Sequence, residues 1–108
     1  MVGTKSTLTA GCLGRVEDRG DIDAATERSI AEMTRNHPRR VAQRLSDELV
    51  AGERATRYRI VCPSGPVGLW RFAHVGWLFG ASYRCLPPDD EIEIFNRARA
   101  VLDTWQWQ

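Results

Sequence analysis

The chain has 108 residues, which is enough for one hydrophobic core and too few for two ordinary domains. Its 43% hydrophobic and 27% charged residues exclude a wholly disordered or fibrous protein. No uncharged run, residues 75–83 included, approaches the roughly 20 apolar residues that span a bilayer, and residues 1–20 lack the pattern of a secretory signal. We therefore expect one domain over residues 1–108, a cytoplasmic location and no membrane partner.

The sequence carries no motif that indicates catalysis or a metal site. Cys12, Cys62 and Cys85 lie far apart without C-x-x-C spacing, and His37 and His74 do not complete a ligand set with them. A glycine-rich phosphate loop, a nucleophile elbow and a paired His-Glu helix motif are also missing. We expect the cysteines to be buried thiols, and we expect neither an enzyme nor a metal or other cofactor.

Charge is distributed unevenly along the chain, although the net charge is only +1. Residues 35–71 contain eight arginines and three acids, whereas residues 86–108 contain two arginines and five acids. Fourteen of the fifteen cationic residues are arginine, whose planar guanidinium binds phosphate or guanine through two parallel hydrogen bonds. The basic middle of the chain is therefore the candidate region for nucleic-acid binding.

Apolar residues at helical spacing predict two helices in the first third of the chain. Residues 8–16 have apolar side chains three or four apart and are followed by the breaker Gly20. Asp21 and Asp23 are candidate N-caps for a second helix that reaches about Thr34. The buried side of this second helix is predicted to hold Ala25, Ile30, Ala31 and Met33.

A third helix is predicted between Pro38 and Gly52. Pro38 disfavours helical geometry at the preceding His37 but suits the first turn of a new helix. Apolar residues then recur one helical turn apart, at Val41, Leu45 and Leu49. The turn between the second and third helices is expected near Asn36.

From Ala55 the apolar period changes to that of a strand. Apolar residues alternate along residues 58–62, and residues 63–66 supply a turn. A second strand over about residues 67–72 therefore completes a hairpin. Residues 77–85 are expected to add another strand. The acids at residues 89–91 favour the start of a final helix, whose apolar residues are Ile92, Phe95, Ala98, Leu102 and Trp105.

The residues of the second and third predicted helices and of the start of the hairpin form one packing pattern. The pair Ile30-Ala31 lets a following helix cross closely, Val41 and Leu45 hold that helix to the core, and Ala51-Gly52 precedes the hairpin. Residues 22–72 thus resemble the winged helix-turn-helix family of DNA-binding proteins, although this chain has Arg35 where the family often has glycine. The resemblance implies an α+β winged helix-turn-helix fold with three N-terminal helices, a β-hairpin wing or small antiparallel sheet, and a C-terminal helix.

The resemblance also implies sequence-dependent binding of double-stranded DNA, as in small transcriptional regulators. Arginine pairs with guanine and glutamine with adenine in the major groove, which makes Arg39, Arg40 and Gln43 the candidates for base contacts. The other candidate DNA contacts, chiefly to phosphates, are Arg35, His37, Arg44, Arg57, Arg59 and the backbone amides around Gly65. A polar helix face that is merely solvated is the competing explanation.

Aromatic residues are concentrated in the second half of the chain. Those at strand spacing are expected in the core, namely Trp70, Phe72, Trp77 and Phe79. Trp105 and Trp107 exceed what a small core absorbs, so we expect a homodimer through the C-terminal helix of residues 89–108.

Residues 37–70 also resemble the second half of a PAS sensory domain. The similarity lies in the pair His37-Pro38, the strand at residues 58–61, and Pro63, Gly65 and Trp70. It would imply a ligand-sensing or protein-interaction module whose aromatic sheet lines a pocket. The paired strands that precede the helices of such a domain are not indicated in residues 1–36. A winged helix that contacts only proteins, as in a phage or plasmid inhibitor, is a third alternative.

Overall fold

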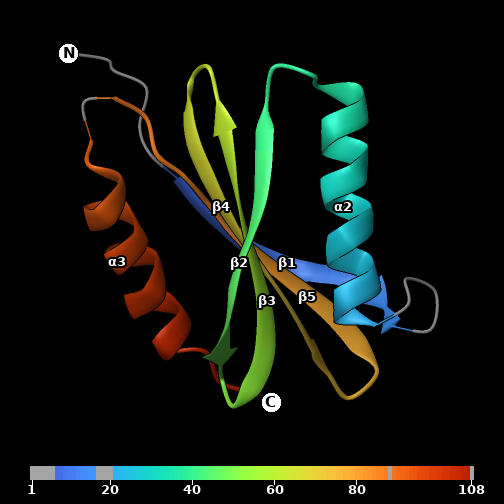
Figure 1. Ribbon diagram of the computed structural model, residues 1–108. Helices are drawn as coiled ribbons and strands as arrows, with labels where there is room; N and C mark the ends of the chain where they lie inside the picture. Colours follow the sequence, from blue (N-terminus) through green and yellow to red (C-terminus); the bar gives the residue numbers. More distant parts are fainter. Residues whose placement is uncertain (1–6, 17–20, 88, 108) are drawn as a thin grey trace.

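The computed structural model describes residues 7–16, 21–87 and 89–107, and its elements form one sheet flanked by two helices (Figure 1). All neighbouring strands are antiparallel in the order β1-β5-β4-β3-β2, so that β4 is the central strand. The strands are β1 (Thr7–Arg15), β2 (Val41–Val50), β3 (Glu53–Cys62), β4 (Gly65–His74) and β5 (Trp77–Arg84), and the helices are α2 (Ile22–Asn36) and α3 (Glu91–Asp103).

The predicted winged helix-turn-helix is wrong, because two of its three N-terminal helices are strands. Residues 7–15 form β1 and residues 41–50 form β2, within a five-stranded sheet. A spacing of four residues, as between Val41, Leu45 and Leu49, fits one face of a strand as well as one turn of a helix. The pattern did not mark a buried face, since Val41 and Leu49 are 64% and 67% exposed.

The second and the last predicted helices are confirmed as α2 and α3. The Asp21 carboxylate accepts a hydrogen bond of 2.8 Å from the backbone N–H of Ala24, and Asp90 caps α3 in the same way. α2 ends at Asn36, before Pro38. The predicted burial of Ala31 is wrong, because its side chain is exposed. Neither described helix is long and apolar enough to cross a membrane.

The predicted hairpin and the strand after it are also confirmed. Cys62 pairs with Gly65, which leaves residues 63–64 as the loop between β3 and β4. The predicted strand at residues 77–85 is β5, which extends the hairpin into a meander. The loops at residues 51–52 and 75–76 have positive φ throughout, which is the conformation of two-residue hairpin loops that match the twist of the sheet.

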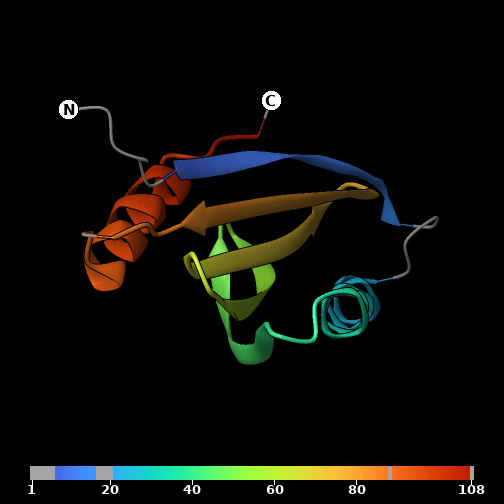
Figure 2. The same ribbon diagram turned by 90° about the horizontal axis from the view of Figure 1, so that it is seen from above.

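Side chains alternate along β4 and thereby divide the protein into two layers on opposite faces of the sheet. Trp70 and Phe72 pack with the residues of α3, whereas Leu69 and Ala73 lie in the clusters beneath α2. Figure 2 shows the two helices on opposite sides of the twisted sheet. Each helix therefore covers a different face, and the larger core lies under α3.

The aromatic residues fill the core under α3. Trp70 and Phe72 are fully buried, and the Trp70 ring lies 5.8 Å from the Phe95 ring. The C-terminal segment adds Trp105, whose ring meets Phe72 edge-on at 5.3 Å. Trp107 stacks on the His74 ring at 3.9 Å. The two terminal tryptophans thus pack within the chain.

Gly68→Ala is expected to destabilise the protein by about 1–3 kcal/mol, because a Cβ at this buried position would overlap the Tyr83 ring. Urea denaturation followed by tryptophan fluorescence measures the change. The matched control is Gly11→Ala, whose Cβ would meet nothing within 4 Å and which should change stability by about 0.5 kcal/mol or less. Equal losses in the two variants would contradict the packing explanation.

Candidate functional site

The predicted DNA-binding residues do not lie on one helix, because residues 41–50 form a strand. Arg39 and Arg40 lie in the turn before β2, and Gln43 and Arg44 lie on β2 itself. The recognition helix that was to carry base contacts from Arg39, Arg40 and Gln43 is therefore not formed. The remaining candidates fall into two groups, those with carboxylate partners and those without.

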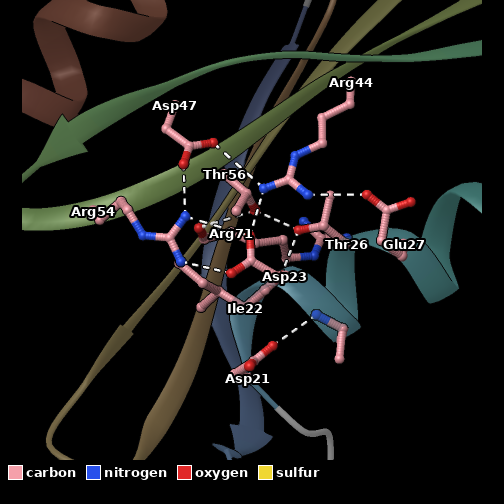
Figure 3. A network of polar contacts seen from close by, with 11 residues as sticks. Asp21, Ile22, Asp23, Thr26, Glu27, Arg44, Asp47, Arg54, Thr56 and Arg71 are labelled. Carbon is pink, nitrogen blue, oxygen red and sulfur yellow. Dashed lines mark hydrogen bonds and ion pairs between the residues drawn. The ribbon is translucent and has the colours of Figure 1, made fainter.

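Arg44 belongs to an ion-pair network that joins α2 to the edge of the sheet (Figure 3). Its guanidinium lies 2.5 Å from an Asp23 oxygen and 2.9 Å from a Glu27 oxygen. Arg54 bridges the same Asp23, at 2.8 Å, to Asp47, at 2.6 Å. Two arginines are thus shared among three carboxylates, and Arg44 has a structural role available without any ligand.

The network shifts the ionisation of Asp23. Hydrogen bonds from Arg54 and then from Arg44 lower the pKa of Asp23 from 3.8 to about 2. The same contacts with Asp23 raise the pKa of Arg44 and of Arg54. All of these groups therefore stay charged across the ordinary pH range.

The two predicted phosphate contacts on the hairpin lie on the α3 face and are ion-paired. Arg57 lies 3.1 Å from Glu48, and its guanidinium stacks over the Phe95 ring at 4.4 Å. Arg59 donates two hydrogen bonds to Glu91, of 2.7 and 2.5 Å, and thereby fastens β3 to the start of α3. Both guanidinium groups are therefore held by carboxylates within the fold.

Tyr83 completes the cluster at the start of α3. Its hydroxyl donates to Glu91 at 3.0 Å, and burial followed by the nearby Glu91 charge raises the pKa of Tyr83 to about 12. The hydrogen bonds from Arg59 lower the pKa of Glu91. This arrangement is a structural ion pair with a neutral phenol attached to it.

Gly65, predicted to offer backbone amides to phosphate, has a packing reason to be glycine. Its φ is +137°, a conformation that other residues rarely adopt. A Cβ at this position would also overlap the carbonyl oxygen of Cys85. Close approach of two backbone segments thus accounts for this residue.

The remaining predicted residues form an exposed cluster between α2 and β2, here called the basic turn (Arg35, His37, Arg39 and Arg40). Arg35, His37 and Arg39 are exposed, and Arg40 is half-buried with a guanidinium nitrogen 3.7 Å from the Met33 sulfur. Within the described ranges 7–16, 21–87 and 89–107, none of the four has an ion-pair partner. Three positive charges are therefore available to a ligand here.

A groove that no sequence pattern predicted runs along α2 on the same face of the sheet. Three adjoining open hollows, of about 200, 260 and 300 Å³, share Leu69 as a lining residue. The first lies over β1 and β5 and is lined by Leu13, Leu69 and small residues together with the polar side chains of Thr9, Arg71 and Ser82. The second lies between α2 and the sheet, and the third opens towards Arg40 and Arg84. We call these three hollows together the α2 groove.

Arg71 lines two of the three hollows and is half-buried in the floor of the α2 groove. One guanidinium nitrogen donates to the Tyr58 hydroxyl at 3.0 Å and the other to the Trp70 carbonyl at 3.2 Å. Gly80 lies opposite Arg71 on β5, where a Cβ would come within 2.9 Å of the guanidinium. The glycine therefore leaves the space that the guanidinium occupies.

Arg71 has no carboxylate partner in the part of the chain that the structure describes, whereas six other arginines have one. The arginines that do have such a partner are Arg44, Arg54, Arg57, Arg59, Arg97 and Arg99. A half-buried guanidinium that is fixed by two neutral acceptors keeps N–H donors for an anion. The floor of the groove is thus positively charged.

The rim of the α2 groove carries charges of both signs. Arg40 and Arg84 line one hollow, and Glu32 and His37 of the α2 side line another. Arg84 donates to the Ser64 hydroxyl at 3.3 Å. Arg40 and Arg84 outnumber Glu32 on the rim, which favours binding of an anion. The Glu32 carboxylate could accept a hydrogen bond from a donor group of the same ligand.

The sequence contains a feature that could have identified Arg71 as a functional residue, although the spacing of apolar residues did not indicate it. Arg71 stands between Leu69 and Ala73 at inward positions of a predicted strand, where a charged residue is costly unless it has a function or a partner. This feature identifies Arg71 only when it is known that both faces of the strand are covered.

No further chemistry is evident from clusters or from similarity. Among residues 7–16, 21–87 and 89–107, no three His, Cys, Asp or Glu side chains gather as a metal site would require. No family model matches the chain, and neither a curated protein nor a solved structure matches it. The α2 groove and the basic turn are therefore interpreted from their own geometry.

Lowering the pH from about 4 to about 2 is expected to weaken folding through Asp23. Its pKa is depressed in the folded protein, so its contribution is complete above 3.8 and is lost as the pH falls towards about 2. Asp23→Asn should therefore flatten the dependence of unfolding free energy on pH in this interval. Urea denaturation at several pH values measures the slope. The control Asp103→Asn, at an exposed helix end, should keep the slope of the unmodified protein, and identical slopes for both variants would refute the role of Asp23.

Proposed function

We propose that the chain binds a small anionic ligand, with a carboxylate or phosphate group, in the α2 groove. The observation that carries the proposal is the Arg71 guanidinium, which lies in the floor of an open groove without a carboxylate partner among the described residues. Removing an arginine partly from water is unfavourable unless it gains hydrogen bonds or a counterion. An anionic ligand would supply that counterion.

The surroundings of Arg71 support a preformed site. The Tyr58 hydroxyl and the Trp70 carbonyl hold the guanidinium in place, so that a ligand need not order a flexible side chain. Thr9 and Ser82 share a hydrogen bond of 2.8 Å beside it and offer hydroxyl groups to the same hollow. One charged fork and two hydroxyls suit the oxygens of a carboxylate or phosphate.

The expected ligand is small, and it does not contact the aromatic core. Trp70 and Phe72 face α3, so the aromatic-lined pocket of a PAS-like module does not correspond to the α2 groove. The hollow over β1 and β5 is instead lined by Leu13, Leu69 and smaller side chains with one cation. A compact, polar anion fits this lining better than an extended aromatic ligand.

Arg71→Met is expected to weaken binding of inorganic phosphate or succinate about tenfold or more, because a hydrogen bond to a charged group contributes about 1.5–3 kcal/mol. Titrations followed by amide NMR shifts measure the affinity and place the site, which should involve residues of β1, β4 and β5. Arg97→Met is the matched control, since Arg97 lies on α3 and pairs with Glu93. Equal weakening by both variants, or shifts confined to other elements, would contradict the proposal.

Double-stranded DNA binding is the second candidate function, and the basic turn favours it. Arg35, Arg39 and Arg40 are cations without ion-pair partners in the described part of the chain, and Arg39 and Arg40 line an open hollow of about 340 Å³. Such a cluster suits contacts with the phosphates of a nucleic-acid backbone. These contacts do not require a recognition helix. A role in transcription regulation would follow only if this binding depends on sequence.

Arg39→Ala/Arg40→Ala is expected to reduce binding to duplex DNA and to lower the salt dependence of log K by about two, because each arginine would neutralise about one phosphate. Fluorescence anisotropy at several salt concentrations measures both quantities. Arg71→Met should leave the slope unchanged, which separates this function from the anion site. If the unmodified protein fails to bind duplex even at low salt, the DNA candidate is excluded.

A homodimer through α3 has less apolar surface available than the sequence suggests. Trp105 and Trp107 pack against Phe72 and His74, so they are not free for a second copy. The exposed large apolar residues of α3 are Ile92 and Val101, at 69% and 52% exposure. These two residues offer a small interface for an α3-mediated homodimer.

A further inference from the structure

The two edges of the sheet differ in how they are protected against further pairing. β1 and β2 are the edge strands, and each pairs with one neighbour. β2 carries Arg44, Asp47 and Glu48 and has a bulge between Leu45 and Glu48. Charges and bulges are the usual devices that prevent an edge from pairing with another strand. The β2 edge is therefore protected.

The β1 edge lacks such protection over most of its length. Residues 7–14 contain no charged side chain, and the bulge in β1 comes only after Cys12. Residues 9–13 are all exposed, and Leu8 is half-buried against the core of α3. Residues 7–12 are thus a regular, uncharged run whose outer backbone groups have no strand beside them in the described part of the chain. Such an edge favours pairing with a further strand.

We propose that β1 pairs with β1 of a second copy, antiparallel, to form a symmetric dimer with one continuous sheet. Self-pairing of one edge uses the same surface in both copies and therefore closes without leading to a fibre. It joins the two unprotected edges and leaves the protected β2 strands at the outer margins of the combined sheet. Residues 7–14 themselves place no charged side chain in the pairing, and Arg15 follows the bulge at the end of β1.

The strand geometry fixes the expected register. Residues directly opposite each other in an antiparallel pair point to the same face of the sheet, whereas neighbouring residues of one strand point to opposite faces. The two-fold axis must therefore pass beside a residue that pairs with its own copy, and not between two residues. Ala10 lies in the middle of the regular run from Leu8 to Cys12, and centring there places Thr9 opposite the partner's Gly11. Ala10 itself is exposed and lies opposite the partner's Ala10.

The dimer would also change the α2 groove. Thr9, Gly11 and Leu13 line the hollow beside Arg71, and β1 forms its outer border. A partner strand would extend the floor of this hollow past β1. This consequence rests on the proposed anion-binding function, whereas the dimer itself does not.

Charge substitutions at Ala10 test the pairing. The unmodified protein should sediment at twice the chain mass of 12.2 kDa. Ala10→Lys and Ala10→Glu should each be monomeric, because like charges directly opposite each other destabilise a strand pair. An equimolar mixture of the two should restore the dimer, which shows that both variants are folded. Gln43→Lys, on the exposed part of the β2 edge, is the matched control and should remain dimeric.

Hydrogen exchange of the unmodified protein gives a second test without variants. Amides of β1 should exchange more slowly as the protein concentration rises, whereas amides of β2 should not change. A monomer at every concentration, a dimer that persists in both Ala10 variants, or dissociation by Gln43→Lys alone would overturn the proposal. Phosphate binding by a protein that remains monomeric would refute the dimer while supporting the anion site, so the two failures are distinguishable.

Discussion

The alternation of side chains along β4 is the constraint on which the rest of the structure depends. β4 is the central strand, so it has a strand hydrogen-bonded along each edge and a layer of side chains on each face. Trp70 and Phe72 point to one face and require a large apolar partner, which α3 and the terminal tryptophans provide. Leu69, Arg71 and Ala73 point to the other face, where α2 provides a thinner cover. The groove exists because the bulk of the aromatic core lies on the opposite side.

The cover on the α2 face thins along the helix for a reason visible in its residues. The first turns of α2 bury Ile22, Ala25 and Thr26 against the sheet. Ser29 and Glu32 follow and line the groove instead of filling it. Further along the helix, Ile30 and Met33 still pack on the sheet but are only half-buried, which leaves polar and charged groups beside an open floor.

Carboxylates divide the arginines into structural and available groups. Arg44 and Arg54 fasten α2 to the sheet, Arg57 pairs with Glu48 of β2, and Arg59 fastens the hairpin to α3. Arg71 and the basic turn have no such partner in the described residues. A cluster of arginines in a sequence therefore does not by itself indicate a binding surface, because folding neutralises some of them and leaves others.

The sequence by itself determined the elements whose signals are local. The candidate caps at residues 21 and 23, the acids at residues 89–91 and the turn at residues 63–66 predicted α2, α3 and the β3–β4 hairpin, because capping, charge at a helix start and turn formation involve neighbouring residues. Only the tertiary structure decided that residues 7–15 and 41–50 are strands, since a spacing of four residues fits a helix and a strand equally. The candidate site depended on tertiary structure still more. Arg71 meets α2 and β1 only when β4 lies between β3 and β5, and the ion pairs that occupy Arg44, Arg57 and Arg59 join residues distant in the chain.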